Sequence, residues 1–117
     1  EKYNSDFVFI TNYPYSARSF YVMKDKDKTK TYDLLYKGIE ITSGAIREHR
    51  YDVLKNQIIE KGYDPKNFEF YLEFFKYGMP PHGGFGVGMN RILMRLFEID
   101  NIREATFIYR GPTRLNP

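Results

Sequence analysis

The sequence predicts an α+β fold in which an antiparallel β-sheet is joined to a group of helices. Its β-prone runs come in neighbouring pairs with short connectors, which is typical of hairpins. Its helical periodicities cluster in the second half of the chain. The sequence also holds 11 Tyr and 10 Phe but no Trp. Because buried tyrosines must satisfy a hydroxyl, these residues favour a sheet with one polar face.

The first half of the chain supplies the predicted strands. Residues 7–11 and 20–23 are short, apolar and β-prone, and a proline-containing connector separates them. Residues 24–30 (KDKDKTK) mix both charge signs without periodicity and predict a solvated loop. Residues 31–50 predict a long hairpin whose two β-prone runs meet at Lys37-Gly38.

The second half supplies three predicted helices and a last strand. The first helix covers 51–61 and ends before Gly62, a residue favoured just past a helix end. The second begins at Asp64-Pro65, which offer an N-cap and a first-turn proline. One buried stripe of that helix comprises Phe68, Tyr71, Leu72 and Phe75.

The third predicted helix, residues 87–97, is amphipathic and precedes a strand at 105–109. Its apolar face comprises Met89, Ile92, Leu93, Leu96 and Phe97. Arg91 lies on the opposite side of the helix. A cation near a helix start and off its apolar face is available to a ligand.

Composition narrows the classes of function. Cysteine is absent, which excludes disulfides, thiolate metal sites and a cysteine nucleophile and is typical of cytosolic proteins. No apolar run approaches the roughly 20 residues of a membrane span, and the acidic start lacks the basic region of a signal peptide. We therefore expect a cytoplasmic location and no membrane partner. The net charge of +3 permits an anionic ligand without indicating nucleic-acid binding.

Two carboxylates, Asp33 and Glu40, flank the predicted hairpin turn and are expected opposite or nearly opposite one another. Facing like charges are destabilising unless a cation lies between them. Two carboxylates together with phosphate oxygens make a common Mg²⁺ site. The alternative is that one carboxylate points to solvent or pairs with Lys37 or Arg47.

The hairpin's second strand continues into "SGAIREHR", residues 43–50. Gly44 and Ala45 keep the surface of the strand open, so that Arg47 could present its guanidinium to a carboxylate of a ligand in two parallel hydrogen bonds. A surface pair of Arg47 with Glu48 or Asp52 is the alternative.

Glycines dominate "HGGFGVGMNR", residues 82–91. The stretch lacks the third glycine of the dinucleotide fingerprint and the Lys-Ser/Thr pair of a Walker loop. It predicts glycine-rich backbone that enters a helix and offers N–H groups to an anion, with Arg91 in reach of a terminal phosphate. The alternative is that the glycines only allow close helix–sheet packing.

Taken together, these stretches resemble the C-terminal part of a class II aminoacyl-tRNA synthetase catalytic domain, closest to the aspartyl enzymes of archaeal and eukaryotic type. "GFGVGMNR" is similar to the third signature motif of that family at Gly84, Gly86, Gly88 and Arg91. "YDLLYKGIEITSGAIREHR" resembles its active-site hairpin. "YGMPPHGG" and "DNIREATFIYRGPTRLNP" resemble the flanks of the motif.

The resemblance implies a role for each site residue. Asp33 and Glu40 would hold Mg²⁺ on ATP, and Arg47 would bind the side-chain carboxylate of aspartate. Ser43, Gly44 and Gly84 would shape the substrate pocket. Glu40, Gly84, Gly86, Gly88 and Arg91 would bind ATP, with Arg91 as the catalytic contact to the γ-phosphate.

The resemblance also implies the activity of the intact enzyme, which is to activate aspartate with ATP and transfer it to tRNA as a homodimer. No segment matches the first two family motifs or the anticodon-binding domain, so residues 1–117 correspond to the C-terminal portion of the catalytic domain, and we expect this fragment alone to be inactive. Asn90 stands where the family usually has an acidic residue, and the tail replaces an "FPRD"-like stretch. The alternatives are an asparaginyl enzyme or a synthetase-like paralogue that forms asparagine or only binds ligands.

Overall fold

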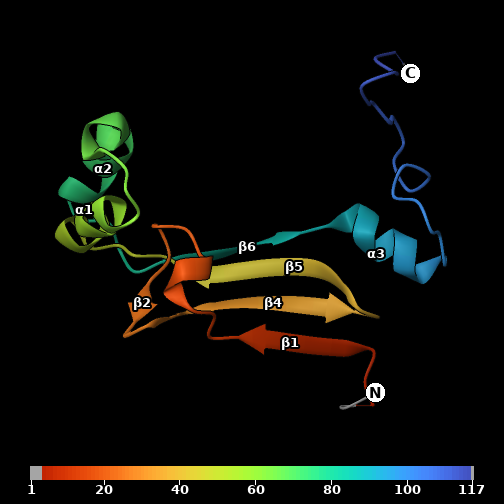
Figure 1. Ribbon diagram of the computed structural model, residues 1–117, viewed down its shortest axis with the longest axis horizontal. Helices are drawn as coiled ribbons and strands as arrows, with labels where there is room; N and C mark the ends of the chain where they lie inside the picture. The colour runs from red at the N-terminus through yellow and green to blue at the C-terminus, as the bar shows by residue number, and fades with distance from the viewer. Residues whose placement is uncertain (1–3, 117) are drawn as a thin grey trace.

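The computed structural model describes residues 4–116, and its main sheet has four antiparallel strands in the order β1-β4-β5-β6 (Figure 1). These strands are β1 (Phe7–Thr11), β4 (Thr31–Tyr36), β5 (Ile39–Ile46) and β6 (Gly83–Val87). The predicted α+β class with an antiparallel sheet is therefore confirmed. Residues 1–3 and 117, at the two ends of the predicted domain portion, lie outside the described residues.

The β4–β5 hairpin turns at Lys37-Gly38, as predicted. Both residues have positive φ, 46° and 81°, which is the conformation of a two-residue turn that matches the twist of the strands. Leu34 pairs with Thr42 and Leu35 with Glu40, so Ile41 is an extra residue in β5 and forms a β-bulge. The Ile41 side chain is buried.

Two predictions for the segment before β4 are wrong. Residues 20–23 do not form a strand, and only Val22 makes an isolated bridge, to Arg47. Residues 24–30 are not a plain loop, because β2 (Lys24–Asp25) and β3 (Lys28–Thr29) form a small hairpin. The physical reason is Thr29, which is fully buried and whose hydroxyl bonds to the carbonyl oxygen of Tyr13. A 3₁₀ turn, η1 (Tyr15–Ala17), precedes this region.

Two helices pack against each other beyond one end of the sheet (Figure 1). The first, α1 (Tyr51–Glu60), matches the prediction within a residue. The second begins as the 3₁₀ turn η2 (Pro65–Phe68), where the Asp64 carboxylate caps the backbone N–H of Lys66, and continues as α2 (Glu69–Lys76). The buried residues between the helices are Leu54, Ile58, Leu72 and Phe75. The core of the molecule therefore includes two members of the predicted stripe.

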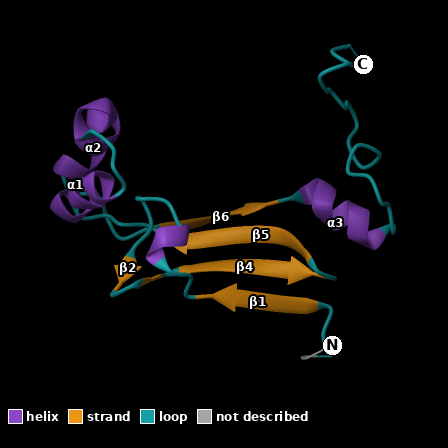
Figure 2. Cartoon of the chain, viewed as in Figure 1, coloured by secondary structure: helices purple, strands orange, loops and turns teal. Residues whose placement is uncertain are grey.

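The last helix, α3 (Met89–Leu96), follows β6 and lies beyond the opposite end of the sheet from α1 and α2 (Figure 1). It begins two residues later than predicted because Val87 belongs to β6. The predicted strand at 105–109 is absent, and this part of the chain runs as turns and loop (Figure 2). Asn90 of α3 donates a hydrogen bond to the Thr106 hydroxyl, which in turn donates to the Ile102 carbonyl and holds a turn there.

Large apolar side chains stand exposed on the sheet and on α3. In the described part of the chain, Phe9, Phe85 and Met89 are each at least 60% exposed. Phe7 stacks on Tyr36 and Phe9 packs edge-on against Tyr32 across β1 and β4. No helix within residues 4–116 is both long and apolar enough to cross a membrane.

Candidate active site

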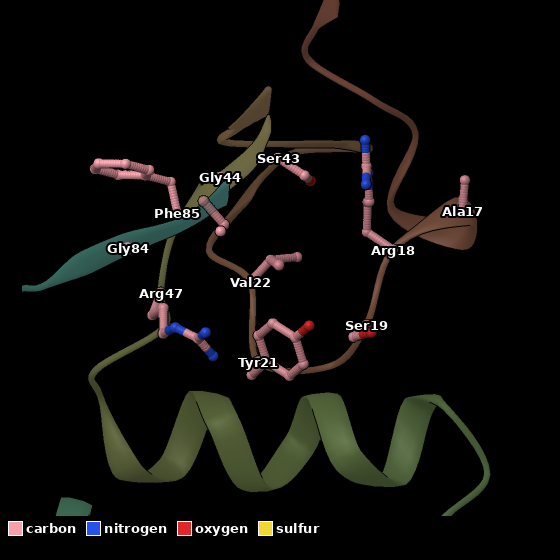
Figure 3. Close-up of a pocket in the computed structure, with 12 residues that line it drawn as sticks. Ala17, Arg18, Ser19, Tyr21, Val22, Ser43, Gly44, Arg47, Gly84 and Phe85 are labelled. Atoms are coloured by element: carbon pink, nitrogen blue, oxygen red, sulfur yellow. The ribbon is translucent and has the colours of Figure 1, made fainter. Parts of the chain in front are cut away.

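A cleft of about 540 Å³ lies between the loop that follows η1 and the neighbouring strands β5 and β6 (Figure 3). Three segments line it: residues 17–22, 43–47 and 84–86. The lining residues are Ala17, Arg18, Ser19, Tyr21, Val22, Ser43, Gly44, Ala45, Arg47, Gly84, Phe85 and Gly86. The structure thus brings five of the predicted site residues to one place, namely Ser43, Gly44, Arg47, Gly84 and Gly86.

The glycines of β6 keep the cleft open. Gly84 pairs with Ala45 and Gly86 with Ser43, so the two glycines share the face of the sheet that carries Ser43. A Cβ added at Gly84 or Gly86 would meet no atom within 4 Å, which means that any side chain there would enter free space. Phe85 points to the other face of the sheet.

The glycine-rich backbone that was predicted to enter a helix and offer N–H groups to an anion is a β-strand for most of its length. Residues 83–87 form the strand β6 and pair with β5. Only Gly88 lies at the start of α3, and its N–H donates to the Ile41 carbonyl at 2.7 Å. Gly84 and Gly86 therefore act through the absence of a side chain, and Gly88 joins α3 to the bulge of β5.

Gly44 acts differently from its neighbours on β5. It pairs with Tyr32, and a Cβ at Gly44 would lie 2.5 Å from a ring carbon of that tyrosine. The missing side chain therefore makes room for Tyr32 on the face of the sheet away from Ser43. Gly44 supplies only backbone to the cleft, whereas Ser43 and Ala45 present side chains to it.

Asp33 holds a cation at the wall of the cleft. It lies opposite Ser43 in the sheet, and its Oδ1 accepts a hydrogen bond from the Ser43 hydroxyl at 2.6 Å. Its Oδ2 accepts one from Nη2 of Arg18, also at 2.6 Å. The Arg18 guanidinium in addition lies 3.7 Å from the centre of the Tyr13 ring, within the range of a cation–π contact. Arg18 is thus fixed between a carboxylate and an aromatic face.

Arg18 is a site residue that the sequence analysis did not find. It lies in a short connector without motif or periodicity, and its partner Asp33 is 15 residues away. The sequence signal near Arg18 is the pair of β-prone runs on either side of it, and this signal does not indicate that Arg18 contacts Asp33. Pairing of Asp33 with Lys37 or Arg47, considered from the sequence, is not present in the described residues.

Burial alone would raise the pKa of Asp33, but hydrogen bonds from Ser43, Tyr13 and Arg18 lower it by more, so the net pKa is below its ordinary value. The unfolded-state pKa of an aspartate is about 4. A carboxyl group whose folded-state pKa is lower than this stabilises the fold fully above its unfolded-state pKa and loses that contribution as the pH falls through the folded-state value. The ion pair is therefore intact at neutral pH and is lost in acid.

We expect Asp33→Asn to remove this acid-dependent part of the stability. In a full-length protein that contains this chain, the variant should have a lower melting temperature than the wild type at pH 7, and the difference should shrink below about pH 4. Thermal unfolding across pH 2.5–7 measures it. Asp52→Asn, at the start of α1, is the control. An Asp33→Asn deficit that stays constant down to pH 2.5 would contradict the assignment.

Arg47 lies at the other end of the cleft, where β5 ends. Its guanidinium lies 4.5 Å from the centre of the Tyr21 ring, and Figure 3 shows the two side chains next to each other. The predicted alternative of a pair with Glu48 or Asp52 is not found among the described residues. Glu48 is fully buried and instead binds the guanidinium of Arg50 through both of its oxygens. Arg47 is therefore left to face the cleft.

Glu40 and Arg91 form a second part of the site outside the cleft lining. Nη1 of Arg91 donates to the Glu40 carbonyl at 2.9 Å and to its Oε1 at 3.3 Å. Both side chains are about half exposed, so a ligand can reach them. Glu40 pairs with Leu35 and Ser43 with Asp33, two residues apart on β4, which places this pair about 7 Å along the sheet from Ser43.

Asp33 and Glu40, which were expected to lie opposite or nearly opposite one another, are near each other but not directly opposite. Asp33 faces Ser43 and Glu40 faces Leu35, because the turn lies at Lys37-Gly38 and Ile41 is inserted as a bulge. The two carboxylates are diagonal neighbours on one face. Both oxygens of Asp33 have partners, while Oε2 of Glu40 has no hydrogen-bond partner among the described residues. Glu40 therefore fits a Mg²⁺ ligand better than Asp33, and no cluster of three or more such ligands occurs within residues 4–116.

The family follows from comparison with known proteins. The model for tRNA synthetases class II (D, K and N) matches residues 1–109. The chain belongs to this family. The match covers the sheet, the cleft and α3, so the site described above lies within the residues that match the family.

Class II synthetases of two kinds are similar to this chain. It is 52% identical over its full length to the aspartate–tRNA(Asp) ligase of Pyrococcus horikoshii and 48% identical to the aspartate–tRNA(Asp/Asn) ligase of Aeropyrum pernix. It spans 27% of the length of each of these relatives. Among solved structures, the aspartyl-tRNA synthetase of Entamoeba histolytica matches with a TM-score of 0.92 at 44% identity, over 99% of this chain and 25% of that one. The asparaginyl-tRNA synthetase of P. horikoshii matches with a TM-score of 0.86 at 39% identity, over 95% of this chain and 28% of that one.

Proposed function

We propose that this chain is part of an aspartate–tRNA ligase, which activates aspartate with ATP and transfers it to tRNA. In the first step the α-carboxylate of aspartate attacks the α-phosphate of ATP, an O–P bond forms, and pyrophosphate leaves with the electrons of the bond that breaks. The product is aspartyl-adenylate. Such a reaction depends on positioning and charge neutralisation more than on an acid or base.

The observation that carries the proposal is the pair of cations at the cleft. Arg18 and Arg47 come from different segments, and both line the cleft beside the Ser43 hydroxyl. Arg18 is already paired with Asp33, so Arg47 supplies the uncompensated positive charge, which favours an amino acid with an anionic side chain. The neutral amide of asparagine would leave one guanidinium without a charged partner, so the arrangement favours aspartate over asparagine.

ATP is proposed to lie along β5 toward α3, with its phosphates near Arg91. Arg91 would contact the γ-phosphate, and Gly84 and Gly86 leave room for the ligand over β6. Glu40 would hold Mg²⁺, which when bound supplies positive charge to the phosphate oxygens. Asp33 is proposed to act through Arg18 and Ser43, which it fixes at the cleft wall, rather than as a second metal ligand.

Competition between amino acids tests the proposal. In the full-length protein, aspartate-dependent exchange of pyrophosphate into ATP should exceed asparagine-dependent exchange at least tenfold in kcat/KM. The 117-residue chain alone should show no exchange, because it lacks the motif whose arginine would contact the α-phosphate. Preference of the full-length protein for asparagine, or robust exchange by the isolated chain, would contradict the proposal. We further propose that the intact enzyme works in the cytoplasm as a homodimer.

A further inference from the structure

Helix α1 holds one wall of the cleft through a buried amide. This wall segment, residues 15–22, comprises η1 and the loop after it. Gln57 of α1 is 1% exposed, and its Nε2 donates hydrogen bonds to the carbonyl oxygens of Phe20 and Val22, the latter at 3.0 Å. These two carbonyls lie on either side of Tyr21, which lines the cleft. One side chain therefore fixes the main chain both before and after a residue of the site.

The chemistry of the partners determines how this amide is oriented. Both are carbonyl oxygens, which only accept hydrogen bonds, so the NH₂ group of Gln57 must face them. Its Oε1 atom is buried and has no hydrogen-bond partner among residues 4–116. A buried amide with one unsatisfied atom is costly. The two donated bonds are therefore what holds this side chain in place, and through it the wall segment.

The start of the wall segment is tied to the other end of α1. Nζ of Lys61, the residue just past the helix, donates to the carbonyl oxygens of Tyr15 at 2.7 Å and Ser16 at 3.3 Å. The Tyr15 carbonyl also accepts the N–H of Arg18 at 3.2 Å. The Tyr15 hydroxyl donates to the main-chain carbonyl of Gln57 at 3.4 Å. The helix thus holds the wall segment immediately before Arg18 as well as around its later residues.

Tyr21 connects the wall segment to the cation that faces the cleft. Its ring lies 4.5 Å from the Arg47 guanidinium, and its carbonyl accepts the N–H of Glu48 at 2.9 Å (Figure 3). A shift of the main chain at Tyr21 would take the ring away from the guanidinium. A long side chain that is ordered before binding loses less conformational entropy when a ligand arrives, so this support contributes to affinity.

From this geometry we infer that Gln57 and Lys61 are positioning residues, which hold the wall segment and so set the amino-acid affinity of the cleft. The inference rests on the proposed function. Gln57 acts through Tyr21 on Arg47, and Lys61 acts on the main chain that leads to Arg18. Neither Gln57 nor Lys61 lines the cleft, so their effect on a ligand is indirect.

The first test is Gln57→Met in the full-length enzyme, which keeps the length and helix propensity of the side chain but removes both donors. We expect the KM for aspartate in ATP–pyrophosphate exchange to rise about tenfold, with kcat changed less than threefold and the KM for ATP within twofold. Ile58→Val is the matched control. It removes a methyl group from a fully buried neighbour on α1 and lowers stability, but it leaves the hydrogen bonds to the wall segment in place.

A purely structural role of Gln57 would change all kinetic constants together and would be reproduced by Ile58→Val. An aspartate KM within twofold of the wild type in Gln57→Met, an equal rise in the KM for ATP, or an equal rise in Ile58→Val would overturn the inference. A double variant tests the route. In the Tyr21→Leu background, Gln57→Met should raise the aspartate KM less than twofold further, and a full tenfold effect there would contradict action through Tyr21.

The second test is Lys61→Met, at a position that is only partly buried and so tolerates substitution. The KM for aspartate should rise about threefold to fivefold. Lys61→Arg keeps a cationic donor and should stay within twofold of the wild type. Lys55→Met, at an exposed position of α1, is the control for the lost charge. An unchanged aspartate KM in Lys61→Met, or an equal rise in Lys55→Met, would overturn the role of Lys61.

Failure of the proposed function is separable from failure of this inference. If the wild type prefers asparagine, the same ratios are measured with asparagine. If it activates neither amino acid, the proposed function fails, and hydrogen exchange of the wall segment in the full-length protein decides the inference. Gln57→Met should speed exchange of its backbone N–H groups at least fivefold and Ile58→Val less than twofold. Equal exchange in Gln57→Met and the wild type would overturn the inference.

Discussion

Arg91→Ala in the full-length enzyme is expected to lower kcat for aspartate-dependent ATP–pyrophosphate exchange by about 10²–10³-fold. The guanidinium is half exposed at the start of α3 and is held by the carbonyl and carboxylate of Glu40. It is therefore positioned before the ligand binds, and its charge can oppose the negative charge that develops on the pyrophosphate. Alanine removes the charge without filling the space, so no other group on α3 replaces it.

Arg103→Ala is the matched control for this variant. Arg103 is an exposed arginine beyond α3 that stacks on Tyr109 at 4.6 Å from the ring centre, and it lies outside the site. Its loss should leave the exchange rate within twofold. If Arg91→Ala were as active as Arg103→Ala, the phosphate contact assigned to Arg91 would be wrong. Arg91→Lys should recover part of the rate, because a charge remains but the forked geometry is lost.

Arg47→Leu is expected to lower kcat/KM for aspartate by about 10²–10³-fold, mainly through KM. Arg47 makes no ion pair with another described residue, so its charge is free for a ligand at the cleft. Without it, the side-chain carboxylate of aspartate would be desolvated beside Tyr21 with Arg18 as its nearest cation, and Arg18 already binds Asp33. The variant should also lose discrimination against asparagine.

Steady-state exchange with aspartate and with asparagine measures both effects. Arg110→Leu, an exposed arginine in the C-terminal segment, is the control and should keep wild-type constants for both amino acids. Substitutions at Arg47 and at Arg91 are expected to change different kinetic constants. A change at Arg47 acts on amino-acid affinity and a change at Arg91 on the rate of the chemical step. If Arg47→Leu raised the KM for ATP instead, the two ends of the site would have been assigned the wrong way round.

The hairpin and the first two helices could be predicted because their signals are local. Lys37-Gly38 determines a tight turn by its backbone conformation. Asp64 caps the backbone N–H of Lys66 and Pro65 occupies the first position of η2, so this helix start depends on neighbouring residues only. Arg18 could not be predicted, because its place in the site depends on a salt bridge across 15 residues of sequence. The strand expected at 105–109 failed for the opposite reason. Its composition is β-prone, but no strand within residues 4–116 pairs with it, and Asn90 holds Thr106 in a turn.

The role of the glycines was the least predictable part of the site. Spacing alone could not distinguish a loop that binds anions through N–H groups from an edge strand, because both need residues without side chains. The pairing with β5 shows that this stretch is an edge strand, because the backbone of Gly84 and Gly86 lies in the sheet. The same pairing explains why Gly44 must be small, because the ring of Tyr32 lies where its side chain would be.

The bulge at Ile41 limits which sequence changes the site can accept during evolution. In a regular strand, residues three apart point to opposite faces of the sheet. Without the bulge, Glu40 and Ser43 would therefore lie on opposite faces. The extra residue reverses this parity, and both side chains face the same side as Asp33. The residues proposed to recognise the amino acid and those proposed to recognise phosphate thus lie on one surface only while that single insertion is kept. Substitutions at either end of β5 can alter one specificity at a time, whereas deletion of one residue between them would separate the two.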